Sequence, residues 1–115
     1  ATDWCGVKTG AKVDKFKEMN LHKENAKFVK CPMIKESPVS IECKVKEIVE
    51  LGSHHMFIAD VLAINSDEKY IDDKGAFDIS KCDLIAYSNG HYYELGKKIG
   101  FSVQKKQKNK KQVKK

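Results

Sequence analysis

The sequence predicts a mainly β fold with short helices, and three observations carry this prediction. Residues 39–46 alternate between apolar and polar side chains, which is the pattern of a strand with one solvent-facing side. Residues 55–65 are β-branched and apolar on both faces, as expected of a strand buried in a barrel or sandwich. An Asn89-Gly90 pair separates two further short β-like runs. We therefore expect two β-hairpins and little helix.

The first expected element is a short amphipathic helix within residues 9–19. A Thr-Gly pair precedes it, and Asn20 and Leu21 are expected to end it. Residues 25–34 then predict an irregular or weakly extended connection closed by Pro32, whose fixed φ disfavours both helix and central strand. The apolar side chains that define the helix recur at every third position: Val13, Phe16 and Met19.

The strongest structural prediction is a long hairpin made by residues 38–50 and 55–65. Leu51-Gly52-Ser53 supplies its turn. The apolar alternation fails at Ile48 and Val49, which indicates a bulge or a change to burial on both faces.

Residues 66–74 are acidic and polar and predict a loop or a short helical turn, and residues 78–82 predict one more helical turn. The carboxylates do not have the spacing of an EF-hand, so calcium binding is not expected. Residues 84–87 and 91–95 form the second expected hairpin, because Asn-Gly supplies the two positive φ angles of a tight turn.

The formal charge of +6 over 115 residues suggests a binder of nucleic acid or of membrane surfaces. However, all 22 basic residues are Lys, and seven lie in residues 104–115. Without those seven, 15 Lys face 16 carboxylates, so the remaining chain has a net charge of −1. Because Arg is absent, specific DNA reading is not expected, and no apolar run is long enough to span a membrane.

The composition predicts one domain over residues 1–103 and a disordered Lys-rich tail over residues 104–115. Four strands do not close a barrel around a core. We therefore expect either dimerisation through the open strand edges or further strands before Ala1.

The four cysteines form no C-x-x-C pair, so neither a thioredoxin-type motif nor a zinc ribbon is predicted. Cys43 and Cys82 lie in apolar contexts, where a free thiol behaves as a small hydrophobic group. Reduced cysteines favour a cytoplasmic location. The remaining two are Cys5 and Cys31.

Catalytic and metal-site motifs are absent from the sequence, so the candidate site residues come from less specific patterns. Thr9, Lys12 and Lys15 surround a predicted helix start and suit a phosphate, although surface lysines are usually only solvated. His54 lies at a hairpin turn, where a plain surface histidine is the alternative. Tyr87 lies at a hairpin mouth, where it either stacks on a planar ligand or pairs across the strands.

Read in order, these segments resemble the C-terminal portion of the flavin reductase-like family of FMN-binding split barrels, and most closely its flavoredoxin-type branch. The resemblance covers about residues 3–101. The matching segments are Cys5-Gly6, Thr9-Gly10, Lys12-Val13-Asp14-Lys15-Phe16, residues 38–45, residues 51–58, Ile85-Ala86-Tyr87 and residues 92–96.

The resemblance implies a split β-barrel, here without its N-terminal strands, that forms a homodimer and holds FMN near the subunit interface. Lys15, helped by Lys12 and Thr9, would lie near the FMN phosphate or ring edge. Ser53 and His54 would face the flavin or nicotinamide from the hairpin turn, with His54 as the catalytic candidate. Tyr87 would pack beside the isoalloxazine. The implied reaction transfers electrons from NADH or NADPH through FMN to a redox partner.

A different class of function stays open: a non-catalytic β-rich binding module, or an inactive fragment, whose Lys tail contacts an acidic partner, RNA or anionic lipid. Deleting residues 104–115 separates the two, because binding through the tail is salt-sensitive and would disappear.

Overall fold

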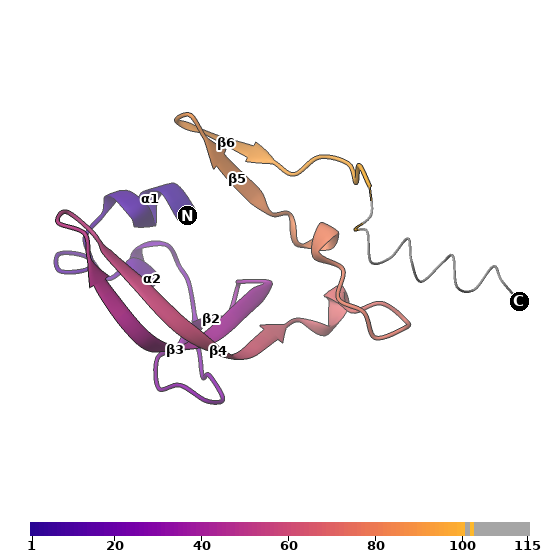
Figure 1. Cartoon of the computed structure of the whole chain (residues 1–115), viewed down its shortest axis with the longest axis horizontal. Coiled ribbons are helices and arrows are strands. Elements are labelled where there is room, and N and C mark those ends of the chain that lie inside the picture. The colour runs from indigo at the N-terminus through magenta and orange to yellow at the C-terminus, as the bar shows by residue number, and fades with distance from the viewer. Residues whose placement is uncertain (101, 103–115) are drawn as a thin grey trace, which may run out of the picture. The chain divides into compact units, whose positions relative to one another are not determined.

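The computed structural model describes residues 1–100 and 102 (Figure 1). It divides into two compact units, one over Ala1–Cys82 and a second that begins at Asp83. The described strands pair into three separate two-stranded antiparallel sheets, and the helices are short. The expected mainly β fold with short helices is therefore confirmed.

The first unit is dominated by the predicted long hairpin, formed by β3 (Val39–Glu50) and β4 (His55–Ser66) (Figure 1). The strands pair antiparallel from Val39 opposite Ser66 to Glu50 opposite His55. Gly52 lies in the connecting turn at φ 84°, a left-handed conformation that glycine adopts without steric cost.

The irregularities of this hairpin differ in position from the prediction. They fall between Glu42 and Cys43 and between Val45 and Glu47, whereas Ile48 and Val49 pair regularly with β4. The expected bulge at Ile48 and Val49 is therefore wrong. Those two apolar residues break the alternation of the sequence without breaking the backbone ladder.

The expected burial of β4 on both faces is also wrong. Phe57 is 61%, Val61 59% and Ile64 67% exposed. Among the described residues, Cys82 is the buried hydrophobic residue and Glu42 the buried charged one. A two-stranded sheet covers neither of its own faces, so the apolar side chains of β4 lie exposed unless another layer packs on them.

The N-terminal region contains two helices, α1 (Thr2–Val7) and α2 (Lys15–Glu18). The predicted helix over residues 9–19 is thus too long, because Thr9 accepts turn hydrogen bonds from the amides of Lys12 and Val13 instead of starting a helix. Asn20, at φ 51°, ends α2 as expected. The helix α1 was not predicted from the sequence.

A short sheet pairs β1 (Lys23–Glu24) with β2 (Met33–Ile34). The strand β1 precedes the connection that the sequence predicts over residues 25–34 as irregular or weakly extended, and β2 forms the last two residues of that connection. The chain around this sheet is tied by a clasp in which both carboxylate oxygens of Glu36 accept the backbone N–H of His22 at 3.0 Å. The His22 imidazole Nδ1 also contacts the Glu36 carboxylate. These bonds hold the pKa of Glu36 below its ordinary value, the backbone N–H being the largest cause.

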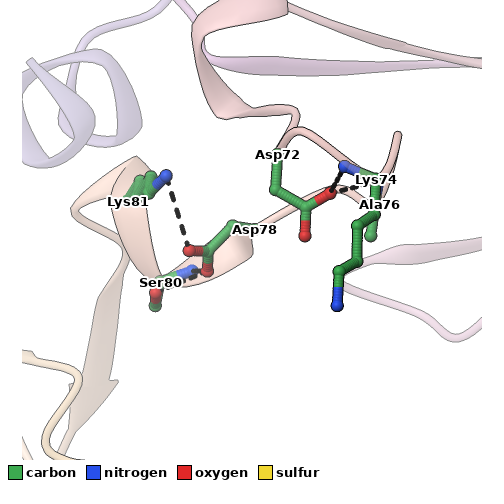
Figure 2. Close-up of polar contacts among 6 residues, drawn as sticks. All are labelled: Asp72, Lys74, Ala76, Asp78, Ser80 and Lys81. Atoms are coloured by element: carbon green, nitrogen blue, oxygen red, sulfur yellow. Dashed lines mark hydrogen bonds and ion pairs between the residues drawn. The ribbon is translucent and has the colours of Figure 1, made fainter.

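The acidic segment after β4 forms two 3-10 turns, η1 (Glu68–Tyr70) and η2 (Ile79–Cys82), which confirms both predicted helical turns. Its carboxylates bind their own loop, as Figure 2 shows for Asp72 and Asp78. Asp72 Oδ1 accepts the amides of Lys74 at 2.9 Å and Ala76 at 2.8 Å. The carboxylate groups therefore organise turns of the backbone.

The second unit contains the other predicted hairpin, formed by β5 (Ile85–Ser88) and β6 (His91–Glu94). Asn89 and Gly90 have φ values of 48° and 79°, the two positive angles that an Asn-Gly turn provides. Among the described residues no helix is long and apolar enough to cross a membrane. The predicted Lys tail lies outside the described residues.

Candidate functional site

Three lysines gather around one open pocket of the first unit, called here the lysine pocket. Its volume is about 590 Å³. Lys12, Lys15 and Lys23 bring three ammonium groups against the single carboxylate of Asp14, so the lining carries an excess of positive charge. Its lining residues are Gly10, Ala11, Lys12, Val13, Asp14, Lys15, Phe16 and Lys23.

The start of α2 fixes the floor of this pocket. Asp14 is the N-cap, and its Oδ1 accepts the backbone N–H groups of Phe16 at 3.1 Å and Lys17 at 3.2 Å. This is the usual cap in which a side-chain oxygen satisfies amides that have no partner inside the helix. The Asp14 carboxylate is therefore directed toward the helix, while the lysine side chains supply the charge available to a ligand.

Two of the lysines are held by further contacts. Lys15 Nζ donates to the carbonyl oxygen of Cys5 at 2.5 Å, which ties α1 to the start of α2. Lys23 Nζ lies 5.1 Å from the centroid of the Phe16 ring, within cation–π distance. Both contacts restrict where the ammonium groups lie, so the positive charge of the pocket is partly preorganised.

Thr9 lies in the turn that leads into the pocket but does not line it. Its Oγ1 accepts the backbone N–H of Ala11 at 3.3 Å. The hydroxyl hydrogen of Thr9 remains available as a donor, because a hydroxyl group both donates and accepts. The structure therefore places Thr9 beside Lys12, whose backbone N–H donates to the Thr9 carbonyl oxygen at 3.2 Å.

The turn between β3 and β4 carries the second group of predicted residues. Ser53 Oγ and His54 Nδ1 lie 2.8 Å apart, and the Leu51 N–H donates to the His54 carbonyl at 2.9 Å. Both side chains are exposed. The serine contact fixes one ring nitrogen of His54 and leaves Nε2 outside that pair, although neither residue is part of the lysine pocket.

Tyr87 lies on β5 in the second unit and is 67% exposed. Its ring meets that of Tyr92, the residue directly opposite on β6, with centroids 5.2 Å apart in an edge-to-face arrangement. The observed contact is the cross-strand pair considered from the sequence. Such a pair leaves much of the Tyr87 ring accessible.

The structure thus brings together part of the predicted site. Lys12 and Lys15 share one pocket, Thr9 adjoins it, and Ser53 and His54 contact each other at a separate turn. Lys23 was missed from the sequence, since it follows the predicted helix and enters the pocket only because the chain turns back after Asn20. No local sequence pattern predicts that the chain reverses after Asn20 and brings Lys23 to the pocket.

The cysteines and acidic residues provide no metal centre among the residues that the structure describes, because no three His, Cys, Asp or Glu side chains there could hold an ion. All four cysteines are free thiols. Cys82 is buried, as its apolar context predicted, but Cys43 is exposed. The prediction for Cys43 is wrong because the face of β3 on which it lies is uncovered.

Comparison with known proteins identifies the family. Residues 1–96 match the model of the flavin reductase like domain. The chain belongs to this family, which confirms the resemblance described above.

Solved structures agree with this assignment. The flavoredoxin of Desulfovibrio vulgaris (Miyazaki F) superposes with a TM-score of 0.79 and 28% identity over 88% of this chain and 55% of its own. The flavoredoxin of Methanosarcina acetivorans gives 0.76 and 29% over 94% of this chain and 57% of its own. A flavin reductase with a split barrel domain from Shewanella frigidimarina shares the fold at a TM-score of 0.71. The split-barrel class expected from the sequence is therefore confirmed.

Curated relatives match over a similar region. An uncharacterised protein of Archaeoglobus fulgidus is 35% identical over 61% of this chain and 40% of its own length. Another from Aquifex aeolicus is 33% identical over 70% of this chain and 41% of its own length. The chain therefore spans about two fifths of the curated relatives and just over half of the solved flavoredoxins.

Proposed function

We propose that this chain is the C-terminal part of an FMN-binding oxidoreductase of the flavoredoxin type, which passes electrons from NADH or NADPH through FMN to a redox partner. The observation that carries the proposal is the family match over residues 1–96, together with the two flavoredoxin structures. Bound FMN would supply the redox chemistry, while the protein binds and orients the reactants.

The lysine pocket fits the phosphate group of such a cofactor. A phosphate monoester carries nearly two negative charges at neutral pH, and ammonium groups form charge-assisted hydrogen bonds with its oxygens. Lys12 and Lys23 line the pocket, and Lys15 does so while bonded to Cys5. In this proposal Lys12, Lys15 and Thr9 hold the phosphate, and Lys23 adds a further charge.

The hairpin turn and the second unit supply the other proposed roles. The bond between Ser53 Oγ and His54 Nδ1 orients the imidazole, which would position the nicotinamide donor or hold a proton at Nε2. Tyr87 presents an exposed aromatic face suited to packing beside a flavin ring. No residue is required to act as a nucleophile.

The proposal includes a homodimer in the cytoplasm. The apolar side chains exposed on β3 and β4 support an association, because exposed apolar surface of this extent marks an interaction face. Ile41, Val61 and Ile64 are each more than half exposed. The cytoplasmic location rests on the free cysteines.

Fluorescence titration tests the cofactor site. We expect the chain to quench the fluorescence of added FMN, and Lys12→Ala to weaken FMN binding about tenfold while affecting riboflavin little, because only FMN carries a phosphate. Lys17→Ala is the matched control, since Lys17 lies on α2 but does not line the pocket.

If the chain does not quench the fluorescence of added FMN, the proposal that this chain binds FMN is wrong. If Lys12→Ala and Lys17→Ala weaken FMN binding equally, the lysine pocket is not the site of the FMN phosphate. With FMN bound, anaerobic addition of NADH or NADPH is expected to bleach the flavin absorbance. The alternative function through residues 104–115 stays a prediction, because those residues lie outside the described ones.

A further inference from the structure

The turn between β5 and β6 consists of Asn89 and Gly90, and both residues are exposed. A Cβ atom added at Gly90 would meet nothing within 4 Å beyond its two chain neighbours. Because glycine has no side chain and the space around it is open, nothing shields the backbone nitrogen of Gly90 on that side. This nitrogen is therefore accessible to a group that can react with it.

The N–H of Gly90 is also free of the hydrogen bonds that protect other turn amides, since no described residue accepts a bond from it. Among the described residues, Asn20 is the other asparagine with a positive φ, at 51°, and it is also exposed. The N–H that follows it, on Leu21, donates to the Phe16 carbonyl at 2.8 Å. A bonded N–H gives up its proton only with the loss of that bond, so the nitrogen after Asn89 is the more available of the two.

The imidazole of His91 contacts the peptide group that joins Asn89 to Gly90. Its Nδ1 lies 2.9 Å from the Asn89 carbonyl oxygen, and because a carbonyl only accepts, Nδ1 carries the hydrogen and donates. When the Gly90 nitrogen loses its proton, negative charge spreads onto this same oxygen. A donor already in place where negative charge develops stabilises that charge.

We propose that Asn89 is a site of spontaneous deamidation, which His91 promotes through its hydrogen bond to the Asn89 carbonyl. The Gly90 nitrogen loses its proton to solvent and forms a bond with Asn89 Cγ. The Cγ–Nδ2 bond then breaks, and a proton from solvent completes the ammonia that leaves. Water opens the resulting cyclic imide at either of its two carbonyl carbons, and no electrons are gained or lost.

The two products differ in which carbonyl carbon the water attacks. One product is aspartate. The other is isoaspartate, in which the main chain continues through the side-chain carboxyl carbon. Because only the cyclic imide leads to isoaspartate, this product identifies the proposed route.

The reaction requires a rotation about the Cα–C bond of Asn89. Positive φ angles at both central residues define a type I′ turn, in which the Gly90 nitrogen is directed away from the Asn89 side chain. The strands β5 and β6 have four exposed residues each, and a two-stranded hairpin is only marginally stable by itself, so this rotation is accessible. The rotation moves the Asn89 carbonyl and His91 together, which preserves the hydrogen bond between them.

Isoaspartate would also change the hairpin that carries it. It adds a methylene group to the backbone of a two-residue turn, and the length of that turn sets the register of the strands. We therefore expect the modified chain to lose the pairing of Tyr87 with Tyr92, which lie opposite each other. This inference does not depend on flavin binding.

Incubation of the chain at fixed temperature and neutral pH, followed by peptide-mapping mass spectrometry, tests the proposal. We expect isoaspartate and aspartate to accumulate at residue 89, and Asn20 to react about tenfold more slowly, because its following N–H must first be released from Phe16. Nuclear Overhauser contacts between the Tyr87 and Tyr92 rings should weaken in step with the isoaspartate content.

Three variants test the role of His91. His91→Ala should slow the reaction at Asn89 about tenfold, the effect of one hydrogen bond to a developing charge. His91→Asn should keep most of the rate, because the asparagine Nδ2 offers a donor at the same distance along the side chain as the imidazole Nδ1. His55→Ala removes an exposed imidazole from β4 and should leave the rate at Asn89 unchanged.

A purely structural role of His91 predicts the opposite sign, since a looser hairpin would rotate more easily and react faster. The proposal is overturned if Asn89 reacts no faster than Asn20 or gives aspartate alone. It is also overturned if His91→Ala leaves the rate unchanged or raises it, if His91→Asn is as slow as His91→Ala, or if His55→Ala slows the reaction equally. If the His91 variants do not fold, the comparison of Asn89 with Asn20 in the unsubstituted chain decides.

Discussion

The two main hairpins of this chain are both specified locally, yet they differ in what their side chains require. The strands β3 and β4 have 12 residues each and carry apolar side chains along both faces. The strands β5 and β6 have four residues each and are joined by a two-residue turn. The short hairpin depends on its turn and on the Tyr87–Tyr92 pair. The long hairpin requires another layer to pack on the apolar side chains that β3 and β4 expose.

The difference shows that strand formation and burial are separate properties. Ile41 and Ile64 lie directly opposite each other and are 57% and 67% exposed. Their β-branched side chains favour the strand, but a two-stranded ribbon has no second layer to take them out of water. The solved flavoredoxins are longer than this chain, since the matches cover 88% and 94% of this chain but 55% and 57% of theirs.

The largest expected effect comes from the exposed face of the long hairpin. Replacing Ile41 and Ile64 by threonine keeps β-branching while removing apolar surface. If the proposed homodimer uses this face, each dimer has four apolar side chains replaced, two in each protomer, and we expect its dissociation constant to rise about a hundredfold. Sedimentation equilibrium measures the change.

The matched control for that experiment is Ile85→Thr in the short hairpin, where Ile85 is 51% exposed. It should leave the dimer dissociation constant nearly unchanged. A similar weakening by both substitutions would show that the two hairpins do not differ in this respect.

A smaller effect is expected from the turns. Gly90 has a φ of 79° and Gly52 a φ of 84°, and an added Cβ would meet no atom within 4 Å at either position. Alanine therefore costs only the left-handed conformation, about 1–2 kcal/mol at each. Gly90→Ala should disrupt the short hairpin, because little else holds it, whereas Gly52→Ala should leave the long ladder paired.

Nuclear Overhauser contacts between opposite strands report this directly. In Gly90→Ala the contacts between the Tyr87 and Tyr92 rings should weaken, while in Gly52→Ala those between Ile41 and Ile64 should persist. Loss of the long hairpin in Gly52→Ala would mean that its turn matters as much as that of the short one.

The smallest expected effect concerns the clasp around the sheet of β1 and β2. Hydrogen bonds from His22 lower the pKa of Glu36 from its ordinary value of 4.5. A carboxyl group with a lowered pKa in the folded state contributes stability above its unfolded-state pKa and loses it as pH falls through the folded-state pKa. The clasp should therefore open only under acid conditions below pH 4.5.

The amide signal of His22 followed by NMR during an acid titration measures this opening. Glu36→Gln should abolish the transition, because the glutamine side chain does not titrate in this range. Persistence of the same transition in that variant would assign it to another group, and the β3–β4 ladder, which has no such clasp, provides the internal reference.

Much of the fold was predictable because its signals are local. The alternation of residues 39–46 and the Asn89-Gly90 turn identified both hairpins, and Asn20 marked the end of α2. The helix over residues 9–19 was predicted too long because its period of apolar residues was a weaker determinant than the Asp14 cap, which starts α2 at Lys15.

The candidate site was predictable only in part. Lys12 and Lys15 are close in sequence, so a helix start was enough to group them. Lys23 joins them through a reversal of the chain, and Glu42 becomes buried through a bond to Phe28, 14 residues away. Neither residue differs in local sequence from an ordinary solvated side chain.

The sequence by itself determined the two main hairpins, where they turn and to which family the chain belongs, because turn chemistry, side-chain alternation and motif order are properties of short stretches. Only the tertiary structure decided which charges meet and which apolar faces remain exposed. Those outcomes depend on where distant segments return and on whether a second layer lies over a strand, and a local pattern contains neither.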